Sequence, residues 1–181
     1  MLKTLGWDRQ CELVFDNVQI PRENLLGQIN QGWEIVEKVL QAATVAKCAE
    51  LAGASRATLE MSLDYAKKRI QFGQLIGLFQ AVKHYFANMS IDTDSSRLIA
   101  YEAAWTLSKG LPATMITARA KSWVGEACAR VTLLAHQIFG GIGFTKDYDI
   151  HLYHRKVKAG ALAFGNASFH WRKISQELLQ S

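Results

Sequence analysis

The sequence predicts an all-α protein, an up-and-down four-helix bundle of long helices with a short N-terminal β-strand stub. The 181 residues contain only two prolines, Pro21 and Pro112, so helix breakers are rare. Hydrophobic residues form 49% of the chain, which is enough to bury the core of one ordinary domain. After about residue 30, apolar side chains recur at three- and four-residue spacing, the period of an amphipathic helix.

The first 29 residues differ from the rest of the chain. Residues 12–15, Glu-Leu-Val-Phe, are typical of a short strand, and Val18 and Ile20 lie beyond a turn signal at Asp16-Asn17. One strand or two cannot form a stable sheet alone. We therefore expect this stub either to pack on the helices or to belong to a sheet that is absent here.

The helices are expected in order from Gln31. Apolar spacing up to Tyr65 favours either one very long helix or two helices broken near Gly53, followed by a loop around Gly73 and Gly77. A second helix is expected from Phe79 towards Lys109, with Gly110 as its stop. A third is expected to have Pro112 in its first turn and to end at the glycines at 140–143. Two shorter helices are expected at about 150–158 and from about Ala167, the latter with Asn166 as a possible N-cap. The buried stripe of the third long helix is expected to contain Ile116, Ala120, Trp123, Ala127, Val131, Leu134 and Ile138.

Three long helices with short connections imply an up-and-down bundle, and a fourth partner must close its core. That partner comes either from the C-terminal helices or from another subunit. The five tryptophans are expected to be core or interface anchors.

Charge and cysteine content exclude several classes of function. The net charge of +5 is mild, its basic residues form only short clusters, and no nucleic-acid-binding module is recognisable. The three cysteines show no CxxC pair, which argues against a disulfide scaffold and a zinc site, and no metal site is expected from the histidines. No apolar run is long enough to span a membrane. We expect a soluble, cytoplasmic protein in which Cys48 and Cys128 are buried thiols.

Three motifs are candidates for a binding function. Arg69-Ile70-Gln71-Phe72-Gly73, followed by Phe79-Gln80, places a guanidinium before a glycine turn, where its planar fork suits a phosphate. The second motif is Gln137-Ile138-Phe139-Gly140-Gly141-Ile142-Gly143-Phe144, whose glycines allow close approach of a ligand to the backbone. The third is Ala163-Phe164-Gly165-Asn166-Ala167-Ser168. Each motif alone is better explained by an ordinary helix end, a glycine cap or a turn.

In this order, and separated by two long helices, these motifs resemble the acyl-CoA dehydrogenase family. The segments 6–8, 14–18 and 21–27 are similar to the last strands of the family's middle β-domain and the lead into its helical domain. Residues 1–29 are thus expected to be a remnant of a β-domain and linker, and residues 30–181 an acyl-CoA dehydrogenase-type C-terminal helical bundle. The resemblance covers nearly the whole chain and does not name the substrate.

The resemblance implies FAD as cofactor, bound across a subunit interface of a homo- or hetero-oligomer. It also implies an acyl-CoA substrate, electron-transfer flavoprotein as partner, and a place in fatty acid metabolism. By resemblance, Arg69 neutralises the FAD pyrophosphate of a neighbouring subunit. The other residues that the resemblance assigns to cofactor binding are Phe72, Gln80, Gln137, Gly140, Gly141, Asn166 and Ser168.

The family's chemistry needs a carboxylate base to remove the α-proton of the acyl thioester. In most members this base is a glutamate in the turn that here contains Phe164 and Gly165, so Phe164 occupies the base position. In a minority the glutamate lies on the first long helix, at a place that here falls at about Ala43. Glu37 and Glu50 are doubtful substitutes about two turns away. The chain is therefore expected to have no catalytic residue of its own, while Phe164 and Gly165 lie at the substrate.

Three functional hypotheses follow. The first is a C-terminal domain of an FAD-dependent acyl-CoA dehydrogenase-like protein, which provides oligomer contacts and part of the FAD site and is inactive alone. The second is an active dehydrogenase of an unusual bulky acyl-CoA, with its base elsewhere or on a partner subunit. The third is a non-enzymatic helical interaction domain.

Overall fold

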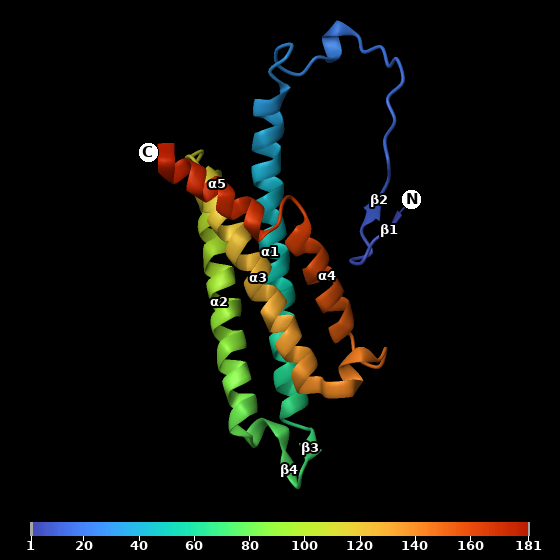
Figure 1. The fold of residues 1–181 in the computed structure, drawn as a ribbon, viewed down its shortest axis with the longest axis vertical. Helices are drawn as coiled ribbons and strands as arrows, with labels where there is room; N and C mark the ends of the chain where they lie inside the picture. Colours follow the sequence, from blue (N-terminus) through green and yellow to red (C-terminus); the bar gives the residue numbers. More distant parts are fainter. Residues whose placement is uncertain (1, 181) are drawn as a thin grey trace.

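The computed structural model describes residues 2–180, and helices dominate it (Figure 1). The long helices α1, α2 and α3 are followed by the shorter helices α4 and α5. Their bounds are α1 Gly32–Ala66, α2 Gln80–Ser108, α3 Thr114–Phe139, α4 Ile150–Leu162 and α5 Ala167–Gln180. Three 3-10 turns lie at Arg22–Asn24, Ile76–Leu78 and Gly140–Phe144. The predicted all-α bundle is confirmed.

The three long helices run up and down beside one another, and the two C-terminal helices pack against α3 (Figure 1). Helix α1 is a single helix of 35 residues, so the one long helix, and not the alternative of two helices broken near Gly53, is observed. The space around Gly53 is open, since an added Cβ atom would meet nothing within 4 Å. Helix α4 also contacts α1, so the C-terminal helices rather than a second subunit supply the fourth partner within this chain.

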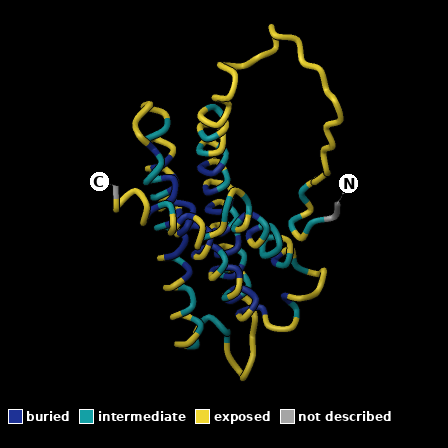
Figure 2. The backbone as a smooth tube through the Cα atoms, turned by 45° about the horizontal axis from the view of Figure 1, so that its top comes forward, coloured by how far each residue is buried: buried dark blue, intermediate teal, exposed yellow. Residues whose placement is uncertain are grey.

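The core lies where α1, α2, α3 and α4 meet, and buried positions run along their facing sides (Figure 2). One cluster surrounds Leu51 and Val124, and a second surrounds Met89 and Val131. Both of these pairs are fully buried, which is the main source of stability expected for a helical bundle. Cys48 and Cys128 are buried as predicted.

Polar contacts cross the core between the long helices. The hydroxyl groups of Ser55 on α1 and Thr93 on α2 are 2.7 Å apart and fully or almost fully buried. Arg130 on α3 donates two hydrogen bonds to the Asp92 carboxylate on α2, at 3.0 and 2.9 Å. Hydrogen-bonded polar pairs of this kind favour one register of neighbouring helices over others.

The N-terminal stub differs from its prediction. The short strands are β1 Leu2–Lys3 and β2 Arg9–Gln10, and they pair with each other, whereas residues 12–15 are not a strand. Residues 12–15 are all exposed and form part of a long loop that stands away from the helices (Figure 1, Figure 2). Since no strand within residues 2–180 pairs with them, their backbone groups have no ladder to join.

Two helix connections also differ from prediction. The expected loop around Gly73 contains a small hairpin of β3 Ile70–Gln71 and β4 Gln74–Leu75. Its two central residues, Phe72 and Gly73, have φ values of 53° and 80°, as a tight type I′ turn requires. Helix α3 begins two residues after Pro112, so that proline precedes the helix instead of occupying its first turn.

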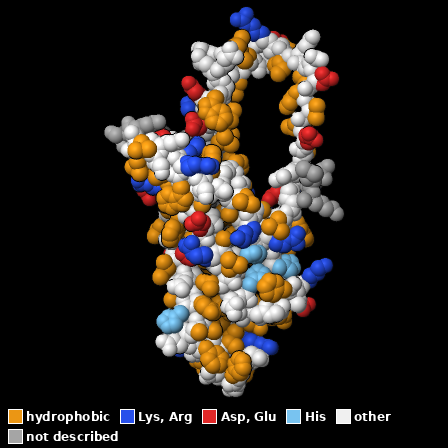
Figure 3. Space-filling view, in the orientation of Figure 1, with side chains coloured by type: hydrophobic (Ala, Val, Ile, Leu, Met, Phe, Trp, Pro, Cys, Tyr) orange, Lys and Arg blue, Asp and Glu red, His pale blue; other side chains and the backbone are white. Residues whose placement is uncertain are grey.

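Large hydrophobic side chains are spread over the surface, including the lower end of the bundle in Figure 3. Within residues 2–180, no helix is both long and apolar enough to span a membrane.

Candidate functional site

The first group of predicted site residues lies at the β3–β4 end of the bundle. Arg69 follows the last turn of α1, and its backbone N–H donates to the carbonyl of Tyr65 at 2.9 Å. Its side chain lines a cavity of about 420 Å³ together with Phe139 and Tyr148. The first and second sequence motifs, far apart in the chain, thus meet at one cavity. Arg69 is exposed and free to pair with an anionic ligand.

Aromatic rings form the wall of this Arg69 cavity. Tyr65 stacks on Phe139 with ring centroids 4.3 Å apart, and Tyr148 meets both rings edge-on at 5.6 and 5.0 Å. Phe72 at the hairpin tip is 94% exposed. The remaining predicted residues near this end are also on the surface: Gln80, Gln137, Gly140 and Gly141.

The second group lies at the turn between α4 and α5. Asn166 begins α5 as predicted, because its side-chain oxygen accepts a hydrogen bond from the N–H of Phe169 at 2.9 Å. Ser168 shares a surface groove with Asn166. Phe164 is 42% exposed and faces a different cavity, described below.

The two groups do not meet within one chain. Thr44 and Tyr65 on α1 line the cavities of the second and first group respectively. At 1.5 Å per residue, these positions are roughly 30 Å apart along the helix. A ligand shorter than this distance therefore cannot contact both groups on the same copy.

The α4–α5 turn has an unusual backbone. Phe164 and Gly165 have φ values of 58° and 97°, both in the left-handed region. Gly165 is required here, because a Cβ atom at this position would lie 2.4 Å from the Phe169 ring. The positive φ of Phe164 is a strained conformation that the surrounding contacts must hold.

A buried lysine holds this turn, and the sequence did not single it out. Lys121 on α3 is 0% exposed, and its Nζ donates to the carbonyls of Ala161 at 2.7 Å and Gly165 at 2.9 Å. These bonds tie the end of α4 and the turn to α3. Trp123, which was predicted on the buried stripe, is instead partly exposed, because the buried face contains Lys121 and Val124.

Burial changes the acidity of the groups beneath the turn. It lowers the pKa of Lys121 from 10.5 to about 8, while the nearby Cys48 acts in the opposite direction. Burial also raises the pKa of the Cys48 thiol to about 12 and that of Cys128 to about 11. Both cysteines are thus protonated at neutral pH and unsuited to act as nucleophiles.

Phe164 lines a cavity of about 330 Å³ between α1, α3 and α5, which we call the Phe164 cavity. Its other lining residues are Trp33, Glu37, Leu40, Gln41, Thr44, Thr114, Thr117, Ala118, Phe169, His170 and Lys173. Ala43, the other predicted base position, is half-buried and is not part of this lining. Of the two carboxylates that sequence reasoning considered, Glu37 lies in the wall and Glu50 does not.

Glu37 and Glu50 are held differently. The carboxylate of Glu37 is 3.8 Å from Nζ of Lys173, across the cavity wall. Glu50 pairs with Lys47 and, at 3.3 Å, with Lys156. Although burial raises the pKa of Glu50, these two lysines outweigh it and hold that pKa below its usual value. Glu50 is therefore a weak proton acceptor.

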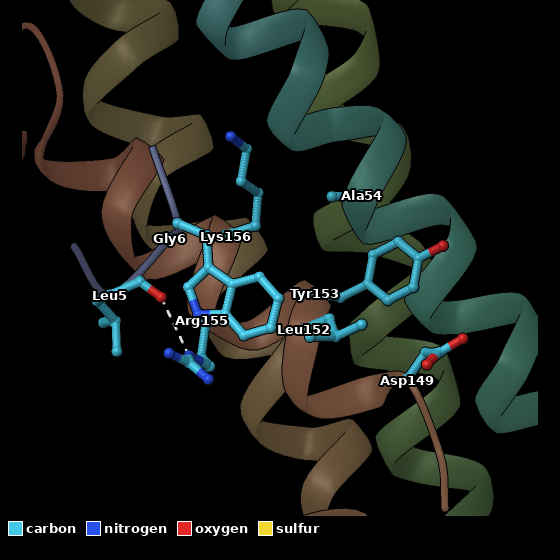
Figure 4. A pocket seen from close by; sticks show the side chains of 9 residues that line it. Leu5, Gly6, Ala54, Asp149, Leu152, Tyr153, Arg155 and Lys156 are labelled. Carbon is cyan, nitrogen blue, oxygen red and sulfur yellow. Dashed lines mark hydrogen bonds between the residues drawn. The ribbon is translucent and has the colours of Figure 1, made fainter. Parts of the chain in front are cut away.

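The N-terminal stub lies against α4 and borders a further, open pocket of about 390 Å³ (Figure 4). Arg155 donates from Nε to the carbonyl of Leu5 at 3.0 Å, and its guanidinium lies 5.1 Å from the centre of the Trp7 ring. Lys156 pairs with Asp8 at 2.5 Å. These contacts explain why residues 5–8 pack on the helices, one of the two expected outcomes for the stub. Between residues 2 and 180, no group of three His, Cys, Asp or Glu side chains could hold a metal ion.

Comparison with known proteins gives consistent matches. Residues 30–179 match the sequence profile of the acyl-CoA dehydrogenase C-terminal domain. An acyl-CoA dehydrogenase of Bacillus subtilis (strain 168) is 33% identical over 93% of this chain and 44% of its own length.

Solved structures match equally well. The ChsE4–ChsE5 complex of Mycobacterium tuberculosis gives a TM-score of 0.92 at 29% identity, over 99% of this chain and 48% of that one. The structure described as PigA with FAD and proline gives 0.86 at 27% identity, over 91% and 43% of the two chains. The chain thus spans less than half the length of these relatives.

Proposed function

Because the chain belongs to the acyl-CoA dehydrogenase family through its C-terminal helical domain, we propose that it supplies oligomer contacts and part of an FAD site without the usual catalytic glutamate. The observation on which this rests is the chemistry of the two family base positions. By the resemblance, Phe164 and about Ala43 fall at these positions, and neither side chain can accept a proton.

The distribution of the predicted cofactor residues supports a shared FAD site. FAD is the cofactor of this family, and one similar structure contains it. Arg69 and Asn166 belong to groups roughly 30 Å apart along the bundle. A cofactor that lies across an interface uses the first group of one copy and the second group of its neighbour. The exposed Arg69 guanidinium then supplies a bidentate partner for the pyrophosphate.

Partners follow from the same proposal. One similar structure is a complex of two different chains, ChsE4 and ChsE5. A hetero-oligomer is therefore as consistent with the family as a homo-oligomer, and in a hetero-oligomer another subunit would contribute the base. The complete protein would take an acyl-CoA as substrate and electron-transfer flavoprotein as acceptor.

The proposed position of Phe164 can be tested by restoring the missing carboxylate. In the complete flavin-loaded protein, Phe164→Glu is expected to gain flavin bleaching by an acyl-CoA under anaerobic conditions. Phe169→Glu, which alters the same cavity away from the family base position, is the matched control and is expected to gain nothing. Equal bleaching by both variants, or by neither, would argue against Phe164 as the residue at the substrate.

An active dehydrogenase with an unusual base is the second candidate, and the position of Glu37 favours it. This carboxylate lines the same cavity as Phe164. If Glu37 is the base, the unmodified protein bleaches with a bulky acyl-CoA, and Glu37→Gln abolishes bleaching while flavin remains bound. A non-enzymatic helical domain, the third candidate, predicts instead that the complete protein purifies without flavin.

A further inference from the structure

We infer that two copies of this chain pair through the outer face of α2. This face carries large hydrophobic side chains that we call the α2 ridge: Ile91, Leu98, Tyr101 and Trp105. They are 65%, 61%, 60% and 56% exposed, respectively. The inference rests on the oligomer contacts of the proposed function and names the surface that makes them.

The spacing of the α2 ridge is that of a seam between helices. Ile91, Leu98 and Trp105 are seven residues apart, and Tyr101 lies three residues after Leu98. Side chains at this spacing form one stripe along a helix, about 21 Å long from the first to the last. Such a stripe matches another helix, because a partner helix presents its own side chains at the same repeat.

The inner face of α2 shows the same repeat in its packed form. Met89, Ser96 and Ala103 are also seven residues apart, and they are fully buried where α2 packs against α1 and α3. Each lies two residues before a residue of the α2 ridge, so the two stripes point about 200° apart around the helix. Helix α2 lies at the side of the bundle away from α4 (Figure 1). The chain thus covers one stripe of α2 and leaves the other exposed.

A groove of about 500 Å³ lies beside the α2 ridge, between α1 and α2. Its walls include the small side chains of Ala49, Ala52 and Ala100. Tyr101 belongs to both the groove and the ridge, so a projecting and a hollowed surface lie side by side. Because a two-fold interface joins the same patch on both copies, a two-fold axis here brings the ridge of each copy to the groove of the other.

The charges around the α2 ridge fit a second copy better than a membrane or a polyanion. Asp94 and Arg97 lie 3.9 Å apart, and the Arg97 guanidinium is 5.9 Å from the centre of the Tyr101 ring. Glu102 is also exposed on this helix. A helix that lies on a membrane surface is rich in Lys and Arg on its polar face, whereas both signs of charge are present here. Tyr, Trp and Arg are enriched at protein interfaces.

Site-directed crosslinking tests the pairing at the centre of the α2 ridge. Cys11, which is exposed, is first replaced by serine, and Leu98→Cys is then added; Cys48 and Cys128 are buried. A short bismaleimide reagent is expected to convert most of this variant into a covalent dimer, because position 98 lies near the two-fold axis. Leu162→Cys on α4, where the leucine is 67% exposed, is the matched control and is expected to give no crosslink.

A charge at the same position tests the affinity. Leu98→Asp is expected to raise the dimer dissociation constant about tenfold or more, since it places a charge at the centre of the interface. Leu162→Asp is expected to leave the constant unchanged. Sedimentation equilibrium measures both constants, and circular dichroism verifies that the helices remain folded.

The outcomes separate this inference from the proposed function. An oligomer in which Leu98→Cys gives no crosslink, or whose dissociation constant Leu98→Asp leaves unchanged, would overturn the α2 pairing and leave the oligomer contacts at another surface. A monomeric unmodified chain would overturn both. A monomer that floats with phosphatidylglycerol vesicles, and no longer does so after Leu98→Asp, would assign the α2 ridge to a membrane surface instead.

Discussion

Lys121 is the residue on which the geometry of the α4–α5 turn depends. A fully buried ammonium is costly, and this one is compensated by two carbonyls, those of Ala161 and Gly165. Because Phe164 lies between them in sequence, Lys121 acts as a positioning residue for the site. A substitution that removes the charge and keeps the side-chain volume separates the effect of the ammonium's hydrogen bonds from the effect of side-chain packing.

We expect Lys121→Met to lower the free energy of unfolding at pH 7 by about 2 kcal/mol, since two buried carbonyls lose their partner. The folded protein holds the pKa of Lys121 at about 8, against an ordinary value of 10.5. Between these pH values the unfolded chain binds more protons, so the lysine's contribution to stability is smallest below pH 8 and grows as pH rises towards 10.5. Urea unfolding of both proteins from pH 7 to 10 measures this. A constant difference across that range would contradict the lowered pKa.

At the scale of the elements, close contact between α1 and α4 depends on Gly160. A Cβ atom there would lie 2.6 Å from Cδ2 of Leu51, which is fully buried. Helix α1 has its own glycine, Gly53, whose surroundings are open. The two glycines therefore form a matched pair for testing the helix packing.

Gly160→Ala is expected to lower the free energy of unfolding by about 1–3 kcal/mol through overpacking against Leu51. Gly53→Ala is expected to raise it by about 1 kcal/mol, because alanine is the better helix former and meets no neighbour. Thermal or urea unfolding checks both signs. Stabilisation by both changes would mean that α4 does not pack closely on α1.

At the scale of the whole molecule, the surface of one copy has exposed tryptophans of the kind that subunit interfaces bury. Trp7, Trp33 and Trp105 are 70%, 66% and 56% exposed, although tryptophan is usually well buried in a monomer. Aromatic residues are enriched at protein interfaces.

We expect the isolated chain to form a dimer or tetramer with little affinity for FAD. Light scattering coupled to gel filtration measures the mass, and flavin absorbance after dialysis measures the cofactor. Trp105→Glu on α2 should weaken the assembly without unfolding the helices, as circular dichroism can verify. A monodisperse monomer of the unmodified chain would contradict the proposed oligomer contacts.

Helix positions could be predicted because long runs of three- and four-residue apolar spacing are typical of amphipathic helices, as in α2. The β3–β4 hairpin could not, because its turn places Phe72 at positive φ where asparagine or glycine is usual. Lys121 was missed for a related reason. A lysine on a helix is normally solvated, and only tertiary structure brings two unpaired carbonyls to it.

The candidate site, like the fold, could be predicted only in part from the sequence. The resemblance assigned Arg69, Gln137, Gly140 and Gly141 to FAD binding without placing them in one cavity of the same chain, and the structure brings Arg69 and Phe139 to one cavity. The assigned roles of the cofactor residues and of Phe164 remain predictions.

The most direct test of the account uses the complete protein that contains this domain, purified as a homo-oligomer. Enoyl-CoA formation and flavin bleaching are followed with a panel of acyl-CoAs of different size under anaerobic conditions. We expect bound flavin, no bleaching and no enoyl-CoA, because with Phe164 and Ala43 at the proposed base positions the α-proton has no base. Stoichiometric α,β-desaturation of any acyl-CoA by that homo-oligomer would contradict it.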